Sequence, residues 1–377
     1  MAIVSPQEKK WRWRIFLIVW LTYFSYYFCR VNMSVVAAAL YEDDPVGFGF
    51  TEAQMGNVFS TLTICYAIGQ FVNGQLGDRF GSRNVVMVGI LGSVVCNYLV
   101  GIMSQVSDDP DVVLGWITVL WGINGFFQSM GWSLMVKALA MWFPLDIRGK
   151  VMGWGGTCYQ WGSAFGTAAA IFLAPTDDDT WRAAFYVPAT YFLIIGIAWW
   201  FLFRNSPGSV GLPPVADHVL AEKTDAKEVQ ARTLKENLIA TVTNKRILIV
   251  AFAFFFLDLN RYMFVNWVPS YLIARNEDND DANLEDFKLA VKLGIHPVAG
   301  SIGAVFCGWA SDRWFDGRRA PMVVIMLGIN TVSSWLFSLA DPTVIWLLIP
   351  ILAAVGFATY GAHVMMVAHC AADFGHA

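Results

Sequence analysis

Charge is scarce in this 377-residue sequence: only 14% of the residues are charged, and 56% are apolar. Soluble domains carry about 25% charged residues. Cysteine is also rare, and the six cysteines lie in apolar segments without CxxC or Cys/His spacing, so we expect no disulfide and no metal site. Apolar stretches of about 20 residues recur along the chain, which predicts an all-α polytopic membrane protein.

Catalytic and cofactor motifs are also lacking. The sequence has no nucleophile elbow, Walker loop, HExxH motif or glycine-rich nucleotide fingerprint. We therefore expect neither an enzyme nor a bound cofactor, and no nucleic-acid partner. His296, His363 and His369 stand in apolar segments and are better explained by packing than by catalysis, although His363 near Tyr360 could face a cavity.

Ten membrane-spanning helices are expected, at residues 13–40, 52–76, 84–105, 111–142, 150–174, 182–203, 246–273, 287–310, 320–340 and 343–371. Of the 25 lysine and arginine residues, 18 lie in the N-terminal segment and in the connectors after spans 2, 4, 6 and 8. The other connectors are acidic, as in YEDDP and SDDPD. The positive-inside rule places the N-terminus and the central loop in the cytoplasm of a multi-pass inner-membrane protein. We expect a monomer in contact with membrane lipid.

An internal repeat divides the chain. GQLGDRFGSR follows span 2, and GWASDRWFDGRR follows span 8. Asp78 and Arg79 are 234 positions from Asp312 and Arg313. These residues are expected at cytoplasmic helix ends, where an acid can dock against a helix N-terminus of the other half and latch one conformation.

The repeat predicts an N-terminal transmembrane half at 1–204, a cytoplasmic linker at 205–244 and a C-terminal half at 245–377. Parallel six-helix halves around a midplane site are typical of secondary transporters. Six spans precede the linker and four follow it, so two helices of the repeat are missing. Either the chain is a fragment or its gene is truncated.

Each half has one arginine inside a span, Arg30 and Arg261, 231 positions apart. A charge at a helix centre costs about 2.5–3.5 kcal/mol, so such a residue faces a cavity or a partner. A structural role for one arginine is possible. Two guanidinium groups that converge would repel each other, but together they suit a phosphate or carboxylate, to which each can donate two hydrogen bonds.

Asp258 lies three residues before Arg261, on the same helix face. It either neutralises Arg261 in the empty state or takes up a proton that is coupled to substrate binding.

Further polar and aromatic residues are candidates for the cavity. Gln128 and Trp132 are four apart, which predicts one helix face, and Gln128 could bond a substrate or a neighbouring helix. Gln70, Tyr159 and Tyr360 could also face the cavity and bind substrate. Gly162 and Gly166 form a GxxxG motif, which favours close helix packing.

GQLGDRFGSR and its second copy resemble the loop signature of the major facilitator superfamily. CRVNMS, GFFQSMGW, WRAAFYVPA, NSPGSVGLPP and NRYMFVNWVPSYL more narrowly resemble the organophosphate:phosphate antiporter family, whose members have twelve helices. That family includes glycerol-3-phosphate and hexose-phosphate transporters and a sugar-phosphate sensor. The resemblance implies that Arg30 and Arg261 bind the substrate phosphate, and that the protein exchanges a phosphorylated or other anionic metabolite for inorganic phosphate.

The sequence also departs from the glycerol-3-phosphate transporters. Tyr159 stands where they have a histidine, Gln70 and Val31 where they have lysines, Pro297 where they have an acid, and Asp258 where they have a tyrosine. The resemblance thus implies a less positive site, better suited to a substrate with an amine or several hydroxyls. A proton-coupled symporter that uses Asp258 and a non-transporting sugar-phosphate sensor remain alternatives.

Overall fold

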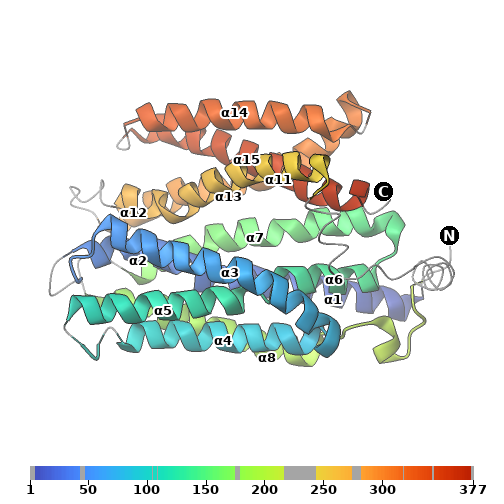
Figure 1. Ribbon diagram of the computed structural model, residues 1–377, viewed down its shortest axis with the longest axis horizontal. Helices are drawn as coiled ribbons and strands as arrows, with labels where there is room; N and C mark the ends of the chain where they lie inside the picture. The colour runs from blue at the N-terminus through green and yellow to red at the C-terminus, as the bar shows by residue number, and fades with distance from the viewer. Residues whose placement is uncertain are drawn as a thin grey trace.

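The computed structural model describes residues 5–42, 47–103, 105–107, 109–174, 179–215, 243–273, 282–316, 318–341 and 344–374. All regular structure in these ranges is helical. The helices run side by side in two bundles, one coloured blue to green and the other yellow to red (Figure 1). Most of the expected linker, residues 216–242, lies outside the described ranges.

The first bundle consists of α1 (Pro6–Tyr26), α2 (Phe28–Tyr41), α3 (Glu52–Phe80), α4 (Ser82–Met103), α5 (Pro110–Gln128), α6 (Trp132–Trp142), α7 (Leu145–Leu173) and α8 (Ala183–Leu202), with short 3-10 turns at Asp179–Arg182 and Pro207–Val210. The second bundle consists of α11 (Lys245–Asn266), α12 (Val268–Ile273), α13 (Ala282–Trp314), α14 (Arg319–Leu339) and α15 (Ile345–Phe374). Every expected span coincides with one helix or with two consecutive helices. Among the described residues, eight spans are long and apolar enough to cross a membrane. The predicted all-α membrane fold is confirmed.

Three spans are broken, between α1 and α2, α5 and α6, and α11 and α12. In the first, Cys29 has non-helical backbone angles, φ −96° and ψ 18°. A break releases carbonyl groups from the helical pattern, and within a membrane these groups need other donors. Each break lies close to a residue that the sequence predicted to bind substrate.

Glycine allows the helices to approach closely. A side chain at Gly162 would collide with the backbone of Phe24 on α1, and one at Gly166 would lie 3.1 Å from Val31 on α2. The predicted GxxxG packing is thus confirmed. Gly356 does the same for the second bundle, because a Cβ there would overlap the His296 carbonyl on α13.

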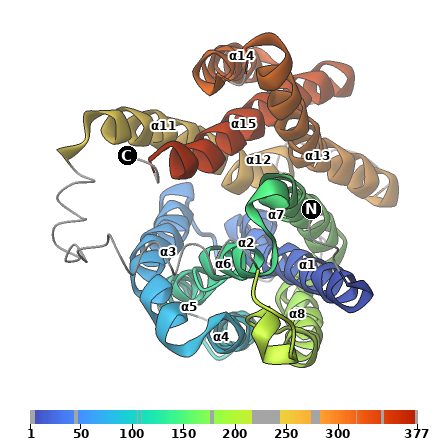
Figure 2. The same ribbon diagram turned by 90° about the vertical axis from the view of Figure 1, so that its right-hand side faces the viewer.

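The two bundles contact each other away from the chain termini. Phe59 on α3 meets Trp267, between α11 and α12, edge to face at 5.5 Å. Ser301 on α13 donates a hydrogen bond to Gln160 on α7 over 2.9 Å. Figure 2 views the molecule from the end that carries the termini, with α1–α8 around one axis and α11–α15 beside them.

We expect Gly356→Ala to destabilise the protein, because the new methyl group must push α15 away from α13. Overpacking of this kind costs about 1–3 kcal/mol. Thermal unfolding in detergent would show a lower Tm for this variant. Gly328→Ala on α14 is the matched control, since its Cβ would meet nothing within 4 Å. Equal Tm values for the two variants would contradict this account of the packing.

Candidate functional site

A cavity of about 320 Å³ lies between the two bundles. It brings together most of the predicted site residues: Arg30, Gln70, Trp132, Tyr159, Asp258 and Arg261. Its other walls are largely aromatic. Along α1 and α11 the lining residues precede the two arginines, so the cavity opens toward the end with the N-terminus. The arginines form its inner end.

Beyond the arginines the space is nearly closed. A hollow of only about 20 Å³ remains there, bounded by Phe59 and Trp121 from the first bundle and by Val265 and Asn266 from the second. Tyr360, predicted to bind substrate, lines this small hollow and is 2% exposed. It therefore belongs to the closed side of the arginines in this conformation.

Arg30 follows the break between α1 and α2 and is held from three directions. Its Nε donates a hydrogen bond to Gln128 Oε1 over 3.1 Å. Its guanidinium lies over the rings of Tyr27 and Tyr66, at 4.8 and 4.9 Å from their centroids. Its Nη2 atom is buried and has no hydrogen-bond partner. A buried donor of this kind is rare in folded proteins and suits an anion.

Gln128 orients Arg30 but does not itself line the cavity. It is fully buried, and its Nε2 donates to Ser93 Oγ over 2.8 Å and to the Tyr26 carbonyl over 3.2 Å. It does not line the cavity, so the expectation that it touches substrate is not supported by this conformation. The alternative, a hydrogen bond between helices, is what the structure shows.

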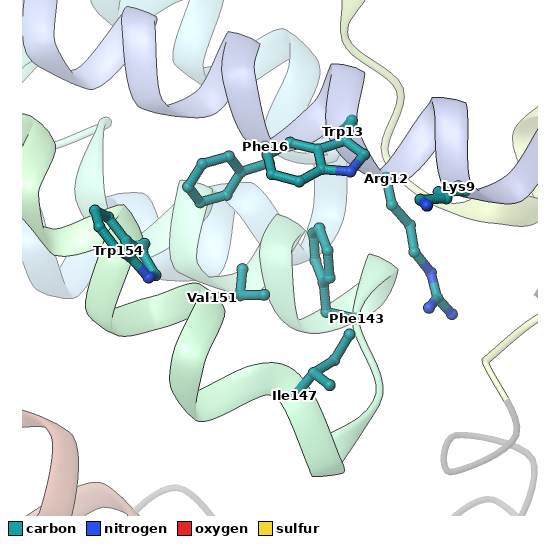
Figure 3. Close-up of a pocket in the computed structure, with 8 residues that line it drawn as sticks. All are labelled: Lys9, Arg12, Trp13, Phe16, Phe143, Ile147, Val151 and Trp154. Carbon is teal, nitrogen blue, oxygen red and sulfur yellow. The ribbon is translucent and has the colours of Figure 1, made fainter. Parts of the chain in front are cut away.

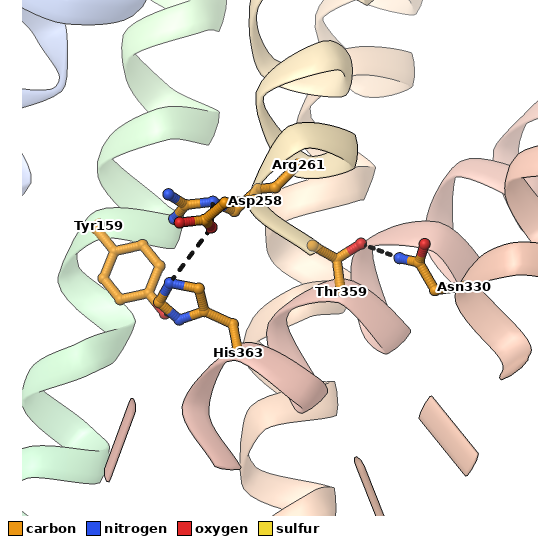
Figure 4. A network of polar contacts seen from close by, with 6 residues as sticks. All are labelled: Tyr159, Asp258, Arg261, Asn330, Thr359 and His363. Carbon is orange, nitrogen blue, oxygen red and sulfur yellow. Dashed lines mark hydrogen bonds and ion pairs between the residues drawn. The ribbon is translucent and has the colours of Figure 1, made fainter. Parts of the chain in front are cut away.

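Arg261 is paired with Asp258 on its own helix. Arg261 Nε and Asp258 Oδ1 are 2.9 Å apart, although neither atom forms a well-aligned hydrogen bond. Arg261 also lies over the ring of Tyr262, at 4.7 Å. Figure 4 shows the pair pointing toward Tyr159 of the first bundle. The misaligned contact leaves both groups able to accept other partners.

His363 on α15 links the two bundles. Its Nδ1 is 3.5 Å from the Tyr159 hydroxyl, and its Nε2 is 3.9 Å from Asp258 Oδ1 (Figure 4). Sequence analysis considered His363 for the cavity but not as a site residue. The repeat contained a signal: His363 follows Gln128 by 235 positions, close to the 231 between the arginines.

The expected latch residues pair within their own bundles. Asp78 forms an ion pair with Lys137 on α6, and Asp312 pairs with Arg319 over 3.1 Å. Arg79 lies over Phe80, and Arg313 is exposed. Among the residues that the structure describes, neither acid contacts a helix of the other half. The latch stays a prediction.

A larger hollow lies elsewhere, between the starts of α1 and α7. It measures about 690 Å³, and Figure 3 shows its apolar walls, which include Trp13, Phe16, Val151 and Trp154. Arg12 at its edge pairs with Glu8 over 2.5 Å. All of its lining residues belong to the first bundle. We assign the site to the smaller cavity because that one joins charged groups from both bundles.

Comparisons with known proteins agree with this architecture. A family model described as Major Facilitator Superfamily matches residues 16–377. The glycerol-3-phosphate transporter of Bacillus subtilis is 30% identical over 94% of this chain and 77% of its own. A probable hexose phosphate transport protein of Chlamydia trachomatis is 31% identical over 99% of this chain and 80% of its own. The membrane sensor protein UhpC of Escherichia coli is 25% identical over 99% and 81%. The resemblance drawn from the motifs is confirmed.

Solved structures share the fold. The inward-open xylose transporter XylE of E. coli superposes with a TM-score of 0.66 at 16% identity, covering 94% of this chain and 82% of that one. A bacterial homologue of the lysosomal transporter Spinster gives 0.64 at 12% identity, covering 93% and 74%. At this identity the likeness concerns the fold alone.

We expect Gln128→Met to weaken the binding of every phosphate ligand by a similar factor. Methionine fills the same space but removes the bond that orients Arg30, and a hydrogen bond to a charged group is worth about 1.5–3 kcal/mol, or roughly ten- to hundredfold in affinity. Intrinsic tryptophan fluorescence titrated with inorganic phosphate and with several organophosphates would measure it. Gln105→Met, at an exposed position, is the control. A loss that depends on the organic part of the ligand would instead show direct contact.

Proposed function

Because the chain belongs to the Major Facilitator Superfamily, we propose that it is a secondary active transporter that exchanges a phosphorylated or other anionic small metabolite for inorganic phosphate. One observation carries this proposal: Arg30 and Arg261, from corresponding helices of the two bundles, line a single cavity. The relatives whose names specify glycerol-3-phosphate and hexose phosphate support the substrate class.

The two arginines suit a phosphate group because a guanidinium can donate two parallel hydrogen bonds to a pair of oxygens. Arg30 is fixed by Gln128 and keeps its Nη2 free. In the part of the chain that the structure describes, the ion pair of Arg261 is the misaligned contact with Asp258. A phosphate between them would satisfy donors from both bundles at once.

Under this proposal, the two facing arginines make exchange obligatory. Two guanidinium groups repel each other in a medium of low dielectric constant, so the empty cavity resists closure around them. A bound phosphate removes the repulsion and bridges the bundles, which favours the closed form. The cavity opens toward the end of the molecule where the N-terminus lies. The distribution of lysine and arginine places this end on the cytoplasmic side. The binding site can then change from one side of the membrane to the other only when it holds an anion, either the metabolite or inorganic phosphate.

Two other functions each have a specific observation behind them. Asp258 and His363 lie within 3.9 Å in the cavity, and such intramembrane groups serve as proton sites in symporters. The similarity to a protein named as a membrane sensor keeps sensing open. A sensor would bind the same ligand without transporting it.

We expect Arg30→Lys and Arg261→Lys each to abolish exchange while the protein stays folded, because a point charge cannot reproduce the two-pronged donor. Vesicles loaded with radiolabelled phosphate would report efflux driven by external organophosphates. Arg14→Lys, outside the cavity, should exchange normally. Wild-type efflux in either cavity variant would refute the proposed anion site. Ligand binding without any flux in the unmodified protein would favour the sensor.

We expect a pH gradient, imposed without internal phosphate, to drive no uptake by the unmodified protein if exchange is its mechanism. If Asp258 carries a coupled proton instead, the gradient drives uptake, and Asp258→Asn removes this uptake, because an amide cannot take up the proton. Initial rates of organophosphate uptake measure the difference. Asp111→Asn, on the exposed first turn of α5, is the matched control.

A further inference from the structure

The geometry points to a zwitterionic substrate: we propose that the metabolite carries a phosphate or phosphonate at one end and an ammonium group at the other. This inference rests on the proposed function and narrows its substrate class. It follows from three features of the cavity, which are its charge balance, the free oxygen of Asp258 and its aromatic walls.

The charges that line the cavity do not balance a phosphate dianion. Among the described residues that line the cavity, the charged ones are Arg30, Arg261 and Asp258, which together carry a formal charge of +1 when His363 is neutral. A phosphate monoester carries about −1.5 to −2 at neutral pH. Uncompensated charge in a site removed from water is costly. An ammonium group on the same molecule reduces the negative charge of the substrate to about −1. That charge balances the +1 of the cavity lining. Monoanionic inorganic phosphate matches it equally.

Asp258 has an oxygen available for the ammonium group. Its contacts with Arg261 and His363 are both made by Oδ1. The side chain is 25% exposed and lines the cavity. When a phosphate takes up the Arg261 donors, Asp258 loses its counter-ion and needs another cation nearby. The ammonium group of the substrate supplies that cation, so the carboxylate stays paired before and after binding.

The walls near Asp258 suit a cation as well. Tyr23 packs against Trp132 at 4.9 Å, and Trp132 meets Tyr159 edge to face at 6.0 Å. Phe254 covers the His363 ring at 5.2 Å on the opposite side. All of these residues line the cavity. Aromatic faces attract alkylammonium groups, at about 0.5–2 kcal/mol per favourable contact.

The test compares ligands of equal shape that differ only in charge. Phosphocholine is paired with 3,3-dimethylbutyl phosphate, and phosphoethanolamine with propyl phosphate. Each is added outside vesicles that contain the full chain and radiolabelled phosphate. We expect at least tenfold faster efflux with the ammonium ligand in at least one pair. Equal rates within both pairs, or a preference for the ligands that lack the ammonium group, would overturn the inference.

Asp258→Asn provides a second readout. It removes the partner of the ammonium group and frees Arg261. We therefore expect the half-saturating concentration to rise for the ammonium ligand and to fall for the matched ligand that lacks the ammonium group. A purely structural role would weaken both ligands together. Asp111→Asn should leave the preference unchanged.

The efflux results distinguish a failure of the proposed exchange function from a failure of the zwitterionic substrate. If neither inorganic phosphate nor any of the four ligands drives efflux from folded protein, the proposed exchange function is wrong. If inorganic phosphate and the ligands without an ammonium group drive efflux as well as the ammonium ligands do, exchange stands and the zwitterion is excluded.

Discussion

The site depends on the break in the first membrane span, just before Arg30. Where the helix is interrupted at Cys29, the freed carbonyl groups must find donors inside the membrane. Buried amides supply them: Asn124 donates to the Cys29 carbonyl over 3.0 Å, and Gln128 donates to the Tyr26 carbonyl over 3.2 Å. Gln128 then uses its oxygen to hold Arg30. One of the two amides that pair with the freed carbonyls, Gln128, therefore also orients the guanidinium of Arg30.

The second bundle repeats this plan incompletely. Asn260, beside Arg261, donates to Asn330 on α14 over 2.5 Å, and Asn330 donates to Thr359 on α15 (Figure 4). These polar contacts anchor α11 but do not reach the guanidinium of Arg261. On α15, His363 faces the cavity and lies 3.9 Å from Asp258. One arginine is consequently fixed by a neutral amide and the other is balanced by an acid that can change partners.

Sequence patterns predicted the spans and the two arginines because these depend on composition and on the repeat, which are visible along the chain. They failed where a break intervened. Gln128 and Trp132 are four residues apart and were expected on one face, but α5 ends at Gln128 and α6 begins at Trp132. The turn between them directs Gln128 into the first bundle and Trp132 into the cavity. Tyr360 and His363 both lie on α15, but Tyr360 lines the small closed hollow and His363 lines the larger cavity. The packing of the two bundles decides on which side of the arginines each residue lies.

The asymmetry between the arginines bears on how the two bundles can move. Under the proposed function, Arg30 would hold the anion at one constant point, whereas Arg261 would exchange Asp258 for the anion as the cavity fills. That exchange alters contacts at the boundary between the bundles, since Asp258 and His363 lie on α11 and α15 while Tyr159 lies on α7. A ligand shifts a conformational equilibrium only through contacts that differ between the two states. The changing partners of Asp258 are such contacts, and they reach the surface along which the bundles must rotate.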